Sequence, residues 1–320
     1  MMLRHCCCVL ALLAAPASYG ADQYPNRPIR LVVPYAVGGA TDITSRIISP
    51  RLSESMGEQV VVDNRPGGAS IPGTALVAKA APDGYTVLVA TMSFGAAPAL
   101  FEKLPFDARK DFAPVTLMTT LPMALTVHPS VPAKNVGELV ALSKSRPNGL
   151  NYGSAGNGSA THLAGALFKT MSGANIVHVP YKGGGPSVAA MIAGEVQVMV
   201  AIVSTVLPHI KSGKLVALGV GTQKRQPVLP NVPTIAEQGI PGFQVFEWQG
   251  MTVPAGTPRA VIERLHREIT KALAIPETHE RITGLGADIV AAGPKELGAL
   301  IDSEIPKWIK VAKETGIKAD

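Results

Sequence analysis

Apolar runs and helical repeats alternate along the first hundred residues of the chain. A continuous, partly β-branched run at 29–35 predicts a buried strand, and apolar residues then recur at helical spacing over 43–57. A short strand at 60–62, a helix at 74–81 and another buried strand at 85–90 follow. This alternation of strand and helix predicts a parallel sheet covered by helices.

A second alternating series begins after an extended region. Residues 115–119 and 123–127 predict two strands with a short break around Pro122 between them. Asn135 is a good N-cap for a helix that ends near Pro147. Further strands are predicted at 150–152, 176–179, 196–203 and 215–220, with helices at 161–171, 187–193 and 206–211.

The C-terminal part begins with another extended segment, at 243–253. The chain beyond it is predicted to be mostly helical, over 260–274 and 294–316 around Trp308. Two alternating series are therefore separated by two extended segments.

This organisation predicts an α/β protein of two doubly wound domains, with an interdomain cleft and two crossing segments. We expect the first domain to comprise residues 22–120 and 249–320 and the second to comprise 121–248. A hinge beneath the cleft would let the domains close around a small ligand, as in a venus flytrap.

Residues 1–21 have the pattern of a secretory signal peptide. Arg4 precedes an apolar run at 9–15 that is too short to span a bilayer, and small residues and a proline follow. All three cysteines, Cys6–Cys8, fall inside this segment. The mature chain is therefore expected to have no disulfide and no thiolate metal site.

Composition and charge narrow the choice of partner. A hydrophobic content of 47% with 16% charged residues is typical of a well-buried globular protein. Without Arg4, 28 basic residues oppose 23 acidic ones, and this mild excess can attract anionic small molecules. The basic residues are scattered and only 5% of residues are aromatic, so no nucleic-acid partner is expected.

The phrase Val-Pro-Tyr, two residues, Gly-Gly occurs twice, at 33–39 and at 179–185. The first copy follows a predicted strand and leads into a helix at Thr41 and Asp42. Glycines allow close approach to the backbone, and a helix start offers unpaired N–H donors and a partial positive charge. Such a turn can bind an anion without a basic side chain, although it can equally be only a tight turn. Asp42 either caps the helix or pairs with an ammonium or hydroxyl group of a ligand.

A second glycine-rich segment, at 152–162, again links a strand to a helix. Ser154, Ser159 and Thr161 offer hydroxyls to a carboxylate, and His162 is either a base or a structural residue. The histidines show no metal-ligand spacing, so no metal and no cofactor are expected.

Two further serines, Ser93 and Ser204, follow predicted strands and either contact a ligand or cap a helix. Three aromatic residues, Phe94, Phe246 and Trp248, either stack on an aromatic ligand or pack in the core.

No nucleophile–base or acid–base pair stands out, which favours a receptor over an enzyme. The enzymatic alternative is a hydrolase that uses Ser154 or Ser159 with His162.

The motifs together resemble the Bug-type solute-binding receptors of tripartite tricarboxylate transporters over nearly the whole mature chain. One departure is Val37, where members often have proline. The matching segments are YPNRPIRLVVPYAVGGATD (24–42), NRPGGAS (64–70), PDGYTVLV (82–89), DFAPVTL (111–117), NYGSAGNGSATHLAGALF (151–168), HVPYKGGGPSVAAMIAGEVQ (178–197), LPNVPTIAEQGIPGF (229–243) and PAGTP (254–258).

The resemblance implies a periplasmic receptor of the type II periplasmic-binding-protein fold. It would act as a monomer and deliver a di- or tricarboxylate, amino acid or aromatic acid to a separate two-component permease. A receptor that presents its ligand to a membrane sensor kinase is the alternative. With Ser93 and Ser204 added from the strand ends, the expected ligand-binding residues are Gly38, Gly39, Ala40, Thr41 and Asp42 in the first loop, Ser154, Gly158, Ser159, Thr161 and His162 in the second, and Tyr181 and Gly184 on the adjoining turn.

Overall fold

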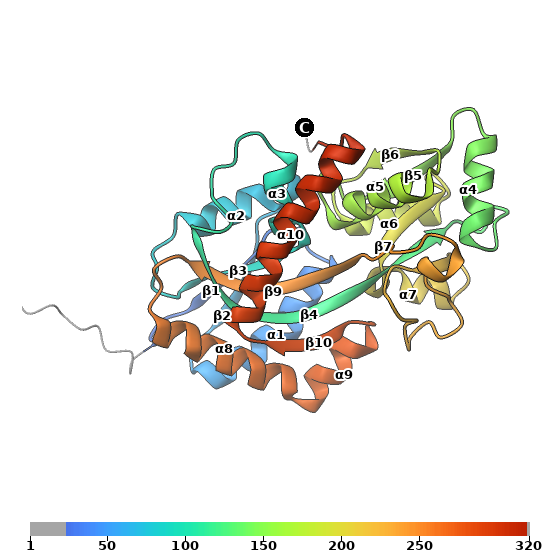
Figure 1. Cartoon of the computed structure of the whole chain (residues 1–320). Coiled ribbons are helices and arrows are strands. Elements are labelled where there is room, and N and C mark those ends of the chain that lie inside the picture. Colours follow the sequence, from blue (N-terminus) through green and yellow to red (C-terminus); the bar gives the residue numbers. More distant parts are fainter. Residues whose placement is uncertain (1–23, 319–320) are drawn as a thin grey trace, which may run out of the picture.

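The computed structural model describes residues 24–318, which form one ten-stranded sheet with helices on both faces (Figure 1). The strands are β1 (Ile29–Val33), β2 (Val60–Asn64), β3 (Thr86–Thr91), β4 (Phe112–Val127), β5 (Leu150–Ser154), β6 (Ile176–Pro180), β7 (Val198–Ile202), β8 (Val216–Val220), β9 (Phe246–Pro254) and β10 (Asp288–Ala292). The helices are α1 (Ala40–Met56), α2 (Ile71–Ala78), α3 (Met92–Leu100), α4 (Val136–Ser145), α5 (Ala160–Ser172), α6 (Gly184–Ile192), α7 (Val203–Lys211), α8 (Arg259–Ala274), α9 (Pro276–Gly284) and α10 (Pro294–Thr315), with 3-10 turns η2 (Gly68–Ser70) and η3 (Ala236–Gln238).

The sheet has two parts that share one long strand. Its order is β2-β1-β3-β9-β4-β7-β5-β6, and β8 and β10 also pair with β4. We call the part with β1–β3 and β10 the first lobe and the part with β5–β8 the second lobe. Parallel pairs form the outer half of each lobe, and antiparallel pairs surround β4. The predicted α/β class with two alternating series is confirmed.

Strand β4 is continuous, so the predicted break around Pro122 is wrong. Along one edge β4 pairs with β9 from Phe112 to Pro122. Along its other edge the partner changes, because pairing with β10 stops at Thr120 and pairing with β7 starts at Met123. Proline is tolerated at this change of partner, where its missing N–H costs little.

The crossing segments predicted from sequence correspond to β4 and β9, which run side by side between the lobes (Figure 1). This pairing agrees with domain boundaries near residues 120 and 249. Those boundaries stay a prediction, and the signal peptide predicted at 1–21 lies outside the described residues.

Three elements are absent from the sequence-based prediction: α3, α9 and β10. Helix α3 contains Gly95 and Pro98, which weaken a helical pattern. It forms because it is buried against α10, with Phe94 only 1% exposed. The predicted N-cap of α4 is confirmed, since the Asn135 side chain accepts a hydrogen bond from the Glu138 N–H at 2.8 Å.

The two faces of the first-lobe sheet are buried under different helices. Leu31 and Val33 pack with apolar residues of α1, α8 and α9, whereas Val32 belongs to a core that also includes α3 and α10. This second core continues without interruption into the second lobe. Helix α10 lies across it and contacts β4 and α5 as well as α3 (Figure 1). Between residues 24 and 318, no helix is both long and apolar enough to cross a bilayer.

Trp308 should be one of the most sensitive core positions. Its side chain is fully buried on α10, and its Nε1–H donates to the Glu304 carboxylate at 2.7 Å. We expect Trp308→Ala to lower the free energy of unfolding by about 3–5 kcal/mol, since it leaves a large cavity. Urea unfolding followed by circular dichroism measures this change. Ile309→Ala, on the neighbouring residue that is 46% exposed, is the control and should change stability by less than about 0.5 kcal/mol.

Candidate ligand-binding site

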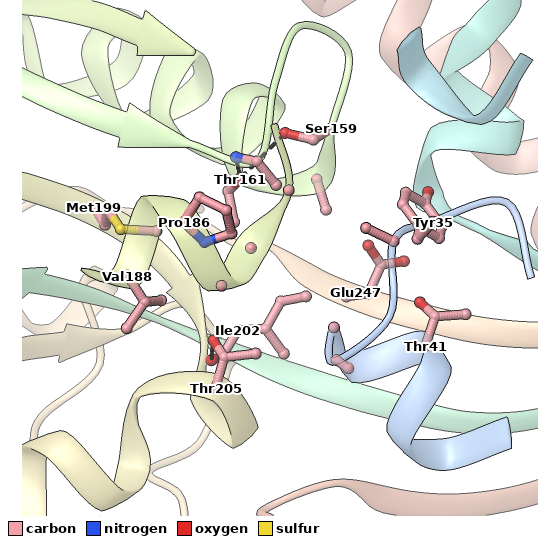
Figure 2. Close-up of a pocket in the computed structure, with 18 of the residues that line it drawn as sticks. Tyr35, Thr41, Ser159, Thr161, Pro186, Val188, Met199, Ile202, Thr205 and Glu247 are labelled. Carbon is pink, nitrogen blue, oxygen red and sulfur yellow. Dashed lines mark hydrogen bonds between the residues drawn. The ribbon is translucent and has the colours of Figure 1, made fainter. Parts of the chain in front are cut away.

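A cavity lies between the lobes, where the carboxyl ends of β1, β5 and β6 meet (Figure 2). Water-sized molecules can occupy about 90 Å³ within it, which is room for several of them. The lining residues are Tyr35, Ala36, Val37, Gly39, Ala40, Thr41, Ala155, Ser159, Ala160, Thr161, Gly183, Gly184, Gly185, Pro186, Val188, Met199, Ile202, Thr205 and Glu247.

Three helices place their first two residues in the wall of this cavity, and the first turn of a fourth, α7, contributes Thr205. The first turns of α1, α5 and α6 all contribute lining residues. Since the first N–H groups of a helix have no intrahelical acceptor, these turns supply unpaired donors and the positive ends of three helix dipoles. The donors that line the cavity are the backbone N–H groups of Ala40, Thr41, Ala160, Thr161, Gly184 and Gly185.

No lysine or arginine occurs among the described residues that line this cavity. The three helix starts therefore give this cavity backbone donors of the kind that bind anions.

The two copies of Val-Pro-Tyr…Gly-Gly face each other across the cavity. A Cβ placed on Gly183 would lie 3.7 Å from the Ala36 Cβ, so the two turns nearly touch. The second copy lines the cavity through Gly183, Gly184, Gly185 and Pro186. Gly183 has a φ of +112°, a conformation that side chains disfavour, so glycine is required there.

A second cavity of about 420 Å³ shares Tyr35, Ala36, Ala155, Ser159 and Gly183 with the first. The two cavities are therefore neighbours that share the walls formed by these turns.

The first predicted loop divides into lining and supporting residues. Gly39, Ala40 and Thr41 line the cavity, whereas Gly38 and Asp42 do not. The Asp42 carboxylate accepts hydrogen bonds from the Gly38 N–H, Arg46 and Asn64. Burial raises the pKa of Asp42, but these hydrogen bonds outweigh burial and hold the pKa below its ordinary value. Asp42 therefore ties the turn before α1 to the first turn of the helix, but the N-cap is Gly39, so Asp42 is not the capping residue.

The second predicted loop divides in the same way. Ser159 and Thr161 line the cavity. Ser159 also caps α5, since its Oγ accepts from the His162 N–H at 3.3 Å, and the Thr161 Oγ1 accepts from the Ala155 N–H at 2.8 Å. Gly158 is outside the lining set and donates its N–H to the His162 Nδ1 at 3.0 Å.

Behind this loop lies a pair of histidines, of which His162 is buried and His178 is half-buried. His162 stacks on His178 with ring centroids 4.0 Å apart, and the His178 Nε2 pairs with the Ser154 Oγ at 2.6 Å. Burial lowers the pKa of each ring to about 4, and for His178 the neighbouring His162 adds to the effect. Both rings are neutral near pH 7 and hold the loop in place. The His162 ring is hydrogen-bonded to Gly158 rather than to Ser154 or Ser159, which does not favour the hydrolase alternative.

The remaining predicted residues lie in three different places. Gly184 lines the cavity, while Tyr181 lines the second cavity. Ser93 and Ser204 line neither, and both hydroxyl oxygens are buried without a hydrogen-bond partner among the described residues. The capping alternative for these serines is wrong, because the N-caps of α3 and α7 are Thr91 and Ile202.

Several of the residues that line the cavity were not identified from the sequence. They are Val188 on α6, Met199 and Ile202 on β7, and Thr205 on α7. In the sequence these residues cannot be told apart from ordinary core residues of a strand or helix. Glu247 did leave a signal, since it is the one charged residue of β9.

The aromatic residues considered from sequence do not line the cavity. Phe94 and Trp248 are buried in the core, and Phe246 packs against it.

The histidine pair should make stability depend on pH. Because the folded-state pKa values lie below the ordinary 6.5, the stabilising contribution is complete above about pH 6.5 and is lost as pH falls towards 4. We expect the free energy of unfolding to drop by about 1 kcal/mol or more between pH 6.5 and 5. His162→Asn should reduce this drop, whereas His279→Asn, on an exposed histidine, should retain it. Denaturant unfolding at the two pH values is the measurement, and equal drops in the two variants would contradict the assignment.

Known proteins resemble this chain over almost its full length. A protein encoded in the tcbD-tcbE intergenic region of Pseudomonas sp. is 41% identical over 93% of this chain and 89% of its own length. Protein BugT of Bordetella pertussis is 37% identical over 96% of this chain and 94% of its own.

Solved structures also resemble this chain over almost its full length. A protein of R. palustris solved with adipate is 35% identical, with a TM-score of 0.88 over 92% of this chain and 99% of that one. MatC of Rhodopseudomonas palustris with bound malate is 34% identical, with a TM-score of 0.86 over 90% and 99% of the two chains. The periplasmic binding protein BugD is 35% identical, with a TM-score of 0.87 over 92% and 99%.

The fold is thus the one found in periplasmic binding proteins of this type. The family model described as tripartite tricarboxylate transporter family receptor matches residues 44–317. The chain belongs to this family of receptors.

Proposed function

We propose that this protein is a periplasmic solute-binding receptor that captures a small carboxylate in the cavity between the lobes. The convergence of three helix starts on one cavity without a basic side chain carries this proposal. A carboxylate there would accept hydrogen bonds from backbone N–H groups of both lobes. Hydroxyls of Ser159 and Thr161 would add to the same site.

The comparisons support the ligand class. The R. palustris neighbour was solved with adipate and MatC with malate, and both ligands are dicarboxylates. Their backbones superpose on this chain with TM-scores of 0.88 and 0.86.

The receptor would work with partners in the membrane. We propose that it acts as a monomer, is exported by residues 1–21 and delivers its ligand to a separate two-component permease. Closure would move residues 22–120 with 249–320 against 121–248, with β4 and β9 as the crossing strands. No step of this cycle requires the protein to change the ligand chemically.

Two glycines of the cavity wall offer a direct test. A Cβ on Gly39 would meet only the Ala36 carbonyl oxygen, at 3.7 Å, and one on Gly184 would meet nothing within 4 Å. Neither residue has a positive φ, so both accept a side chain without backbone strain. We expect Gly39→Val and Gly184→Val to fold normally and to weaken carboxylate binding by about tenfold or more, because the added methyl groups occupy the site of the ligand. Isothermal titration with adipate and malate measures the affinity.

Gly284→Val, at an open position on α9 outside the cavity lining, is the matched control and should bind as the wild type does. Thermal melting in the presence of each acid provides a second readout, since a ligand raises the melting temperature according to its occupancy. Unchanged affinity in both cavity variants would refute the assignment of the site.

A further inference from the structure

Among residues 24–318, Glu247 is the one carboxyl group in the cavity wall. It lies on β9 and is 3% exposed. Its Oε1 accepts two backbone hydrogen bonds, from the Met92 N–H at 2.8 Å and from its neighbour Trp248 at 3.0 Å. Oε2 accepts none from the residues in the described range, which leaves it available to a ligand.

The surroundings of Glu247 favour its neutral form. Burial raises the pKa of Glu247 to about 8, and the charge of Glu304 on α10 raises it as well. The two backbone hydrogen bonds lower the pKa but do not outweigh burial. Glu247 in turn acts on Tyr35: burial and the charge of Glu247 raise the pKa of Tyr35, whose hydroxyl pairs with the Thr91 Oγ1 at 2.6 Å. Since both lone pairs of Oε1 are engaged, the proton of the neutral acid resides on Oε2.

The cavity therefore has two polar ends with an apolar middle. Ser159, Thr161 and the starts of α5 and α6 form the end from the second lobe. Glu247 lies at the opposite end, beside Tyr35 and Thr41 at the start of α1 (Figure 2). Ile202 lies between these two ends, and Val188 and Met199 extend the apolar wall on the far side of Thr161 and Pro186 (Figure 2).

We propose that Glu247 is a specificity-determining residue that donates a hydrogen bond from Oε2 to a second carboxylate of the ligand. This inference rests on the proposed function, because the first carboxylate must occupy the helix starts of the second lobe. The start of α1 would share the charge of the second carboxylate. The receptor would thus select linear diacids over monoacids of equal length.

The affinity for diacids should depend on pH. Below about pH 8 the Glu247 carboxyl is protonated and donates to the ligand. Above that pH it ionises and opposes the second carboxylate, so diacid affinity falls by up to about tenfold per pH unit. A monoacid of the same length presents no second carboxylate to this group and should bind equally at both pH values.

The experiment is isothermal titration of wild type, Glu247→Gln and Glu247→Ala at pH 6.5 and pH 9. The probes are linear diacids of four to eight carbons, adipate included, and the monoacids of matching length. Glutamine keeps an acceptor at the position of Oε1 and a donor at that of Oε2, but it does not titrate. We expect its diacid affinity to stay within about threefold of the wild type at pH 6.5 and to lose the pH dependence.

We expect Glu247→Ala to bind diacids about tenfold or more weakly than the wild type at pH 6.5, and to bind monoacids within about threefold of the wild-type affinity. Circular dichroism and thermal melting establish that each variant is folded. If the wild type binds diacids and monoacids equally well at both pH values, the proposed role of Glu247 is wrong, but the proposed function is not affected. If no acid of either series binds, the proposed function fails as well.

Discussion

The antiparallel pairing of β4 with β9 is the constraint on which the rest of the structure depends. These strands pair from Phe112 to Pro122 of β4, and β4 then continues as a member of the second-lobe sheet. One ladder of hydrogen bonds thus joins the lobes, and the core beneath α10 continues across the junction. The facing turns near Ala36 and Gly183 meet because this shared strand sets the distance between the lobes.

The ligand site is built mainly from backbone because the polar side chains of its loops are already engaged. Asp42 closes the start of α1, and the hydroxyl of Ser154 pairs with His178. Within the second loop, the Gly158 N–H donates a hydrogen bond to the His162 ring, so both groups already have a partner. These contacts hold three helix starts in fixed positions, and the helix starts then offer donors that need no reorganisation when an anion enters.

A site of this kind recognises a carboxylate but says little about the remainder of the ligand. Selectivity must come from the side chains that line the rest of the cavity, such as Met199, Thr205 and Glu247. These residues are on β7, α7 and β9, away from the glycine-rich loops that identify the family. A receptor family can therefore keep its loops and exchange ligands by substitutions at such positions.

The sequence by itself determined the α/β class, the two alternating series, the capping of α4 by Asn135 and the glycine-rich strand ends, because these follow from periodicity and local backbone chemistry. Tertiary structure alone decided that Pro122 lies within a continuous strand and that Ser93 faces the core. It also decided that Glu247 lies in the cavity. Burial and the pairing of distant strands set these outcomes, and neither is encoded in the spacing of neighbouring residues.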